Sequence, residues 1–349
     1  MNFITLYDRF IQRQEIQHCV AQEIPKIPKL KMIAIINISK FTNKIKRKIL
    51  SMFLGLVSWL GFAQQDSQYT QYMYNTQMIN PAYAGNRGLL SINGLYRTQW
   101  VGLEGAPETL TFSMNSPLGS RGMGMGLGIV SDKIGPSSET NLTLDASYTI
   151  HLSLNTKLSF GIKAGINLLN VDYTKLNIFN PSDPNFSTNI NNSLSPLIGS
   201  GLYLHHSDTW YLGVSSPNFL NTIHHDGTAT STVMKRAHFY GIAGYVFDIN
   251  STVKLKPTLL TKVVPGAPIA LDLSMNVMFF DKLTLGVAHR LDAAGSGLAA
   301  FQLSDKLMIG YAYDYDTTEL GNYNSGSHEI FLRFELTTKI RKKVNPRFF

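Results

Sequence analysis

Two adjacent histidine pairs are the residues of this chain whose chemistry could hold a metal ion. The pairs His205-His206 and His224-His225 each have an aspartate close by in the sequence, Asp208 and Asp226. Adjacent residues of a strand point to opposite faces, so neither pair can direct two imidazoles at one ion. We therefore expect polar turn and loop residues at both places, and no metal site.

A glycine-rich run, Gly122–Gly128, has the composition of a phosphate-binding loop. It lacks the Lys-Ser/Thr pair of such a loop, and no helical pattern follows it. Glycine at every second position is typical of a strand that curves or packs closely against another segment, such as a plug inside a barrel. The sequence also lacks the Gly-x-Ser-x-Gly and His-Glu-x-x-His motifs of hydrolases. We predict no catalytic residue, no cofactor and no enzyme activity, with a barrel enzyme that lacks these motifs as an alternative.

The formal net charge of +8 could indicate a nucleic-acid partner, but the basic residues are concentrated near the N-terminus. Residues 1–63 hold ten of the 31 Lys and Arg and three of the 23 Asp and Glu, which leaves 21 and 20 for residues 64–349. A basic targeting segment explains this distribution better than a nucleic-acid surface does. Cys19, the single cysteine, lies in the same segment, so a chain without that segment has no thiol for disulfides, catalysis or metal binding.

A secretory signal pattern occupies the end of that segment. The basic run Lys44–Lys48 precedes the apolar run Ile49–Phe62, and Gly61 and Ala63 supply the small residues of a cleavage site. The apolar run is shorter than the roughly 20 residues of a comfortable membrane-spanning helix. We predict that residues 32–63 are a cleaved signal peptide, with a retained signal anchor as the alternative.

The remaining chain divides by composition. Residues 1–31 have mixed charge and no clear period, so we predict a spurious extension before a true start at Met32. Residues 64–88 are rich in Gln, Asn and Tyr and show no alternation, which indicates a periplasmic or plug-like segment that packs on something. Residues 89–336 are predicted to form one domain, and residues 337–349 a basic periplasmic tail.

Residues 89–336 alternate apolar and polar side chains with a period of two, as two-faced strands do. Near the end of the chain, for example, Ile330 and Leu332 oppose Glu329 and Arg333. Only 15% of the residues are charged, against about 25% in an average soluble domain. The runs with this pattern are Leu89–Arg97, Thr109–Ser116, Met123–Ser131, Asn141–His151, Leu158–Leu168, Pro196–His205, Trp210–Ser215, His238–Asp248, Val253–Val263, Ile269–Phe279, Leu283–Arg290, Gly297–Leu303, Leu307–Asp316 and His328–Leu336.

The connections and the polar faces favour a barrel over a soluble β-sandwich, which is the alternative. Short turns follow the even-numbered runs, and longer or Pro/Gly-rich loops, such as Asp132–Ser138, follow most odd-numbered ones. We predict an all-β fold, a closed antiparallel transmembrane β-barrel of about 14 strands with short periplasmic turns and longer extracellular loops. The charges on the polar faces either pair in a filled lumen, which we favour, or line a conducting pore. These charges are Asp145, Lys163, Asp272, Arg290, Asp314 and Arg333.

Segments at both ends of the mature chain resemble one known family. Gln68–Gly85 (QYTQYMYNTQMINPAYAG) resembles the opening signature of the PorP/SprF family of Bacteroidetes outer-membrane proteins, and Tyr96–Thr109 (YRTQWVGLEGAPET) resembles its second signature. Gly326–Ile330 (GSHEI) and the tail Asn345–Phe349 (NPRFF) resemble its closing strand and C-terminus. The strand pattern between them is compatible, so the resemblance covers essentially the whole chain after the signal.

The resemblance implies an exported outer-membrane barrel that supports type IX secretion and gliding motility without being an enzyme. Its partners would be components of that machinery, a large secreted adhesin held at the surface, and outer-membrane lipid, but no nucleic acid. A diffusion channel or transporter of hydrophobic solutes is the alternative. The residues that match the family signatures, and are thereby candidates for partner contact, are Tyr69, Gln71, Tyr72, Asn80, Pro81, Tyr83, Gly85, Arg97, Gln99, Trp100, Gly105, Ala106, Pro107, Gly326, His328, Glu329, Pro346, Arg347 and Phe349.

Overall fold

The computed structural model describes residues 67–176, 188–220, 222–224 and 233–336, with side chains described outside residues 221–235. The extension, the signal peptide and the C-terminal tail that the sequence predicts lie outside these residues. Their assignments therefore stay predictions.

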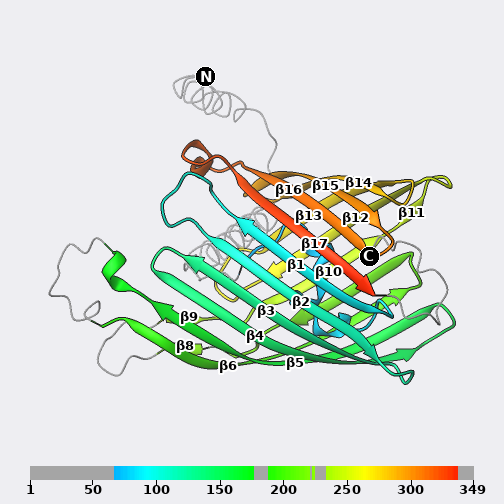
Figure 1. The fold of residues 1–349 in the computed structure, drawn as a ribbon, viewed down its shortest axis with the longest axis horizontal. Coiled ribbons are helices and arrows are strands. Elements are labelled where there is room, and N and C mark those ends of the chain that lie inside the picture. Colours follow the sequence, from blue (N-terminus) through cyan, green and yellow to red (C-terminus); the bar gives the residue numbers. More distant parts are fainter. Residues whose placement is uncertain (1–66, 177–187, 221, 225–232, 337–349) are drawn as a thin grey trace, which may run out of the picture. The chain divides into compact units, whose positions relative to one another are not determined.

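Fourteen antiparallel strands form one closed barrel, in which each strand pairs with the barrel strands before and after it in the chain (Figure 1). The pairing of β1 with β17 joins the two ends of the sheet, and β10 pairs with β12. The barrel strands are β1 (Leu90–Thr98), β2 (Glu108–Leu118), β3 (Met123–Ile134), β4 (Ser137–His151), β5 (Thr156–Val171), β6 (Ile190–His206), β7 (Trp210–Ser216), β10 (Phe239–Tyr245), β12 (Val253–Val263), β13 (Ala270–Phe279), β14 (Leu283–Arg290), β15 (Ala294–Ser304), β16 (Leu307–Asp316) and β17 (Ser327–Leu336).

Three short strands complete the set of described strands. The strands β8 (Thr222–His224) and β9 (Val233–Lys235) pair only with each other, and β11 (Phe247–Asp248) pairs with β12 beyond the end of β10. The predicted fold class is confirmed, and each predicted run coincides with a barrel strand.

Alternation along each strand separates a lumenal face from an outer face. In β17, Glu329 and Arg333 are buried in the lumen, whereas Ile330 and Leu332 are 46% and 48% exposed on the outside. A continuous exposed apolar face of this kind suits hydrocarbon and not water. The period-two pattern therefore determines which face of the wall points into the lumen and which points toward the surroundings of the barrel.

The two ends of the barrel differ in their connections. At the end that we call the turn end, short turns join β2 to β3, β4 to β5 and β15 to β16. At the opposite loop end, residues 172–189 join β5 to β6 and residues 317–326 join β16 to β17. The long loop predicted for Asp132–Ser138 is wrong, because β3 and β4 continue pairing until Ile134 and Ser137, and only Gly135 and Pro136 connect them. Gly135 adopts a φ of 53°, which lets so tight a turn close.

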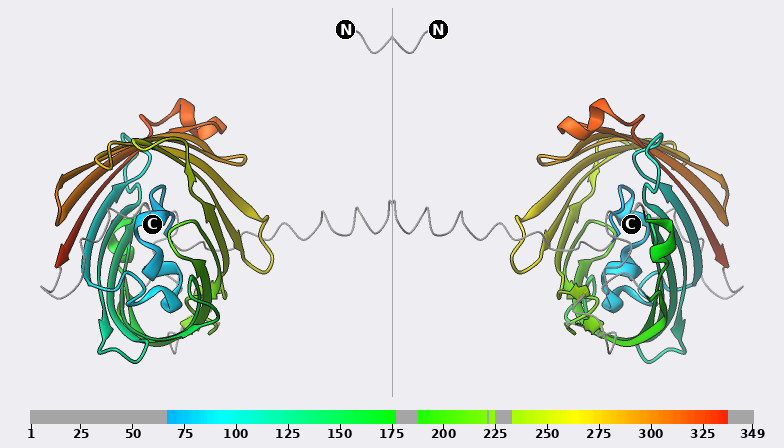
Figure 2. Two further views of the ribbon diagram at one scale, coloured as in Figure 1. Left: turned by 90° about the vertical axis from the view of Figure 1, so that its right-hand side faces the viewer. Right: turned by 90° about the vertical axis from the view of Figure 1, so that its left-hand side faces the viewer.

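The N-terminal segment, residues 67–88, lies inside the ring of strands, where Figure 2 shows it in blue. It folds into three single turns, η1 (Tyr72–Tyr74), α3 (Thr76–Ile79) and η2 (Pro81–Tyr83). Asn80 starts η2, since its side chain accepts the Ala82 N–H at 3.0 Å and Pro81 has the fixed φ of a first helical position. The core of the protein is thus the lumen.

Two further turns, η3 (Tyr173–Lys175) and η5 (Glu319–Asn322), lie in loop-end connections. Within the described part of the chain, no helix is both long and apolar enough to cross a membrane.

Candidate functional site

A buried group of polar residues joins the N-terminal segment to the barrel wall near the loop end. This arginine cluster consists of Thr70, Gln71, Arg97, Asp314 and Glu329. Arg97 of β1 lies directly opposite Glu329 of β17, and Asp314 comes from the neighbouring strand β16. The cluster therefore connects the N-terminal segment with the strands at which the barrel closes.

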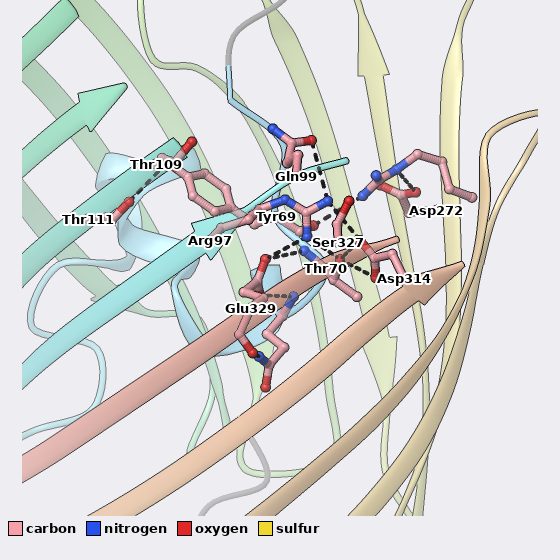
Figure 3. Close-up of polar contacts among 12 residues, drawn as sticks. Tyr69, Thr70, Arg97, Gln99, Thr109, Thr111, Asp272, Asp314, Ser327 and Glu329 are labelled. Carbon is pink, nitrogen blue, oxygen red and sulfur yellow. Dashed lines mark hydrogen bonds and ion pairs between the residues drawn. The ribbon is translucent and has the colours of Figure 1, made fainter. Parts of the chain in front are cut away.

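Arg97 is the centre of the cluster, and only 2% of it is exposed (Figure 3). One guanidinium nitrogen donates to the Thr70 hydroxyl at 2.9 Å and to Glu329 at 3.2 Å. The other donates to Asp314 at 2.7 Å and to Gln99 at 3.5 Å. A planar cation with several donors satisfies all four acceptors at once, which a lysine could not do.

Thr70 and Gln71 complete the bonding of the two carboxylates. Glu329 accepts the backbone N–H of Thr70 at 2.9 Å and that of Gln71 at 2.7 Å. The Thr70 hydroxyl, which accepts from Arg97, donates its own hydrogen to Asp314 at 2.7 Å. The carboxylates that neutralise Arg97 therefore also hold the N-terminal segment, Glu329 through the backbone of the segment and Asp314 through the Thr70 side chain, so the position of the segment depends on the charge pairing.

A second ion pair lies beside the cluster. Arg290 donates to Asp272 at 2.7 Å and reaches the carbonyl of Tyr69 at 3.4 Å. Deeper in the lumen, Lys163 and Asp145 are 3.3 Å apart. These lumenal charges, which the sequence expects either to pair or to line a pore, are paired in the structure.

The tyrosines of the segment fill the lumen below the cluster. The Tyr72 hydroxyl lies 2.8 Å from the Thr258 hydroxyl of β12. Tyr74 stacks on Phe331 with ring centroids 4.6 Å apart, and Tyr83 meets Tyr203 edge to face at 5.4 Å.

Glycines of the wall allow the segment to lie directly on the strand backbones. A Cβ at Gly161 would lie 2.1 Å from the nitrogen of Ala82, and one at Gly124 would lie 2.2 Å from the carbonyl oxygen of Ala84. Contacts that short do not occur, so each position requires glycine while the segment is in place. The expectation that Gly122–Gly128 packs closely against another segment is confirmed.

Gln77 makes a further polar contact with the wall. Its amide donates to Asp145 at 2.9 Å, and its carbonyl oxygen accepts from Asn115 at 2.9 Å. Asn80 likewise donates to the carbonyl of Leu202 at 2.9 Å. The segment is thus fixed along its whole length.

The segment crosses the lumen from one end to the other. Thr70 is held near the loop end, while Arg87 forms an ion pair with Glu335 close to the turn end, where β1 begins. Of the two locations expected from the sequence, residues 67–88 occupy the plug-like one and are not confined to one end of the barrel. The contacts of Thr70 at the far end of β1 hold the segment across the lumen.

Signature residues of the connection from β1 to β2 and of the start of β17 lie at the loop end, above the cluster. The Trp100 N–H donates to the Ser327 hydroxyl at 3.2 Å, and the Val101 N–H donates to the Gly326 carbonyl at 2.9 Å. The hydroxyl of Tyr311 lies 2.6 Å from Nδ1 of His328. Gly105, Ala106 and Pro107 lie in the connection from β1 to β2, Gly85 follows η2 with a φ of 73°, and Pro346, Arg347 and Phe349 lie outside the described residues.

The structure adds contacts that the sequence did not single out. Thr70 and Gln77 lie within the opening signature but were not distinguished from their neighbours, and Asp314 was seen only as a lumenal charge. The signal for all three was available in part, because polar side chains in a segment that must be buried need partners. Their partners in these contacts lie between 27 and 259 residues away in the sequence and could not be assigned.

The arrangement has the chemistry of an anchor. The polar groups of the cluster bond to one another, and among the described residues no group of three or more His, Cys, Asp or Glu could hold a metal ion. His206 bonds Thr156 at 2.9 Å and stacks on Trp210, while the side chains of His224 and His225 lie outside the described ones.

Comparison with known proteins gives one family match and several barrels of known structure. Residues 61–334 match the family described as "Type IX secretion system membrane protein PorP/SprF". No curated protein matches the chain. The KdgM porin is 9% identical and covers 71% of this chain and 99% of its own, with a TM-score of 0.36. The Ralstonia pickettii toluene transporter TbuX is 10% identical and covers 74% and 92%, with a TM-score of 0.43.

Proposed function

The chain belongs to the PorP/SprF family of type IX secretion system membrane proteins, and from this we propose that it is an outer-membrane barrel that holds exported proteins at the cell surface. In this proposal the barrel is not an enzyme and not a diffusion channel. It assembles with components of the secretion machinery, and the protein it retains is a large adhesin of the kind used in gliding.

The filled lumen is the observation that carries the proposal. Tyr72, Gln77 and Asn80 of the N-terminal segment, which bond to the wall, are at most 2% exposed. A diffusion channel needs a continuous aqueous path, whereas here tyrosines and a buried ion-pair network occupy the lumen. A barrel closed in this way is better suited to presenting its loops and rim to other proteins than to passing solutes.

The outer face supports a membrane location. Large apolar side chains such as Leu144, Ile162, Val287 and Leu332 are exposed on successive strands around the wall. Transmembrane barrels carry such an apolar band toward lipid, with short turns at the periplasmic end. We accordingly place the turn end in the periplasm and the loop end at the cell surface.

Cross-linking in cells that contain a type IX machine tests the proposed role. An affinity tag replaces the short turn segment Ser153-Leu154-Asn155, and proteins cross-linked to the purified barrel are identified by mass spectrometry. We expect components of the type IX machinery and an exported surface protein that are absent from a tagged porin of the same membrane. An identical set of proteins for both barrels would contradict the proposal.

A solute-transport role makes a different prediction. Cells that lack the barrel would then lose uptake of a hydrophobic or small polar solute while keeping exported proteins at the surface. Loss of the surface protein with unchanged uptake supports the holding role instead.

A further inference from the structure

The outer wall of the barrel contains a groove that neither the family nor the proposed role assigns. It has a volume of about 980 Å³ and extends over β4, β5, β6, β7, β10 and β12. This volume is at the upper end of the roughly 300–1,000 Å³ of pockets that bind small molecules. Its rim is formed by Tyr148, Phe160, Ile162, Leu202, Phe219 and Phe239, and none of the described residues that line it is charged.

The floor of the groove consists of small residues at outward positions. Ser200 of β6 is paired directly with Ser216 of β7, and Gly241 of β10 is paired with Thr261 of β12. Outward positions elsewhere on the wall include large apolar side chains, such as Leu273 of β13 and Leu285 of β14. A strip of small side chains surrounded by aromatic and branched ones leaves a hollow in an otherwise convex wall.

The same part of the wall is in close contact with the N-terminal segment on its inner side. Gly161 and Gly201 face Ala82 and Asn80, so closely that a Cβ would lie 2.1 Å and 2.2 Å from their atoms. The strands can follow the surface of the segment here because these inward side chains are missing. The hollow outside and the close packing inside thus occur on the same strands.

Two hydroxyls of the floor are hydrogen-bonded within the protein. The Ser216 hydroxyl donates to the Asn218 carbonyl at 3.1 Å, and the Thr261 hydroxyl donates to the Gly241 carbonyl at 3.3 Å. A protein interface carries about one hydrogen bond per 100–200 Å². These hydroxyls are therefore not available for bonds to a partner, and the groove offers mainly apolar surface. Such a surface suits a hydrocarbon chain better than a protein partner.

We propose that the groove is a binding site for one diacyl lipid, whose two hydrocarbon chains lie between the aromatic rim residues. The groove is continuous with the apolar outer face, so the lipid enters it from the surrounding membrane without crossing a polar barrier. The uncharged lining makes the site selective for chains and indifferent to the headgroup. The proposal rests on the membrane location of the barrel and not on its role in secretion.

Lipid retention measured by native mass spectrometry tests the site. The barrel is refolded in detergent micelles that contain dipalmitoylphosphatidylethanolamine, and the bound lipids per barrel are counted. We expect one retained lipid on the unchanged barrel and loss of that lipid when Ser200→Leu and Thr261→Leu fill the floor. Ala299→Leu makes the same kind of enlargement on the outer face of β15, away from the groove, and is expected to retain the lipid.

Folding of each variant is checked by the gel-mobility shift of folded barrels on heating. A second measurement uses the unchanged barrel with a single-chain lysolipid bound. We expect the diacyl lipid to displace the lysolipid, because the groove accommodates two chains. Equal retention by the filled variant and the unchanged barrel would overturn the site. Equal binding of the single-chain and diacyl lipids would also overturn the site. A lipid-free dimer in place of a lipid-bound monomer would overturn it as well, because a second copy would then cover the groove.

Discussion

At the scale of single residues, Arg97 connects three separate stretches of the sequence through one side chain. It contacts Thr70 of the N-terminal segment, Asp314 of β16 and Glu329 of β17, all of them buried. Without the guanidinium, two carboxylates would share a buried site and lose the cation that bonds to both of them. The cluster contributes to stability mainly because the free energy of such unpaired buried charges is high, and not because each ion pair is strong.

Arg97→Met removes the charge and keeps a long, flexible side chain. We expect the free energy of unfolding to fall by about 3–5 kcal/mol, the range seen when one partner of a buried ion pair is removed. Urea unfolding of the barrel refolded into lipid vesicles measures the change. Arg121→Met, in an exposed turn between β2 and β3, is the matched control and should lie within about 0.5 kcal/mol of the unchanged barrel. Equal stability of the two variants would mean that the cluster does not hold the fold.

Gly161→Ala places a methyl group where the backbone of Ala82 lies. Because neither backbone can move without disturbing the wall or η2, we expect a loss of about 1–3 kcal/mol, as for other overpacked cores. The same urea titration measures it. Gly297→Ala, also in a barrel strand but with open space around the added methyl, should cost far less. If both substitutions cost the same, the segment does not press on the wall as described.

At the scale of elements, the N-terminal segment and β1 run in opposite directions along the lumen. The segment passes from the loop end at Thr70 to the turn end at Arg87, where the chain reverses into β1. Residue 67 therefore lies at the end of the barrel that we place at the cell surface. The barrel must close around the segment during assembly, because both ends of the sheet bond to it.

Surface labelling of Ser67→Cys tests this direction. The chain after the predicted signal has no cysteine, so the new thiol is its only one. We expect a membrane-impermeant maleimide to label it on intact cells. Ser153→Cys, in the turn between β4 and β5, should be labelled only after the outer membrane is permeabilised. The reverse pattern would show that the barrel is inserted the other way or that the segment enters from the turn end.

The outward face of β17 gives a second test at this scale. Leu332 is 48% exposed near the middle of the strand, so Leu332→Arg should impair insertion and cost about 2–4 kcal/mol. Vesicle insertion and urea unfolding measure the effect. The same exchange at Leu152, in a turn outside the apolar band, should be tolerated. Equal losses of stability and insertion for the two variants would show that lipid does not contact this face of β17.

Much of the fold could be predicted at the element scale, because period-two alternation survives wherever one face meets lipid and the other the lumen. Leu89–Arg97 and His328–Leu336 were located to within a residue of β1 and β17. The two-residue connection at Gly135 was missed, since a polar residue such as Asp132 can end a strand or continue a lumenal face. The path of the N-terminal segment depends on contacts distant in sequence, such as Thr70 with Asp314, which no local pattern contains.

At the scale of the whole molecule, the segment and the barrel form one core. The buried cluster that fills the lumen includes Tyr72 and Tyr74 from the segment together with Leu298 and Phe331 from the wall. A barrel with this interior is expected to be closed at rest and to act through its surfaces.

Single-channel conductance in planar bilayers tests this central claim most directly. The comparison sample is a variant that lacks residues 67–84, whose folding is verified by the gel-mobility shift on heating. We predict no steady conductance step for the unchanged barrel and discrete open-channel steps for the deletion variant, because removing the segment empties the lumen. A large, stable open channel formed by the unchanged barrel would contradict the account.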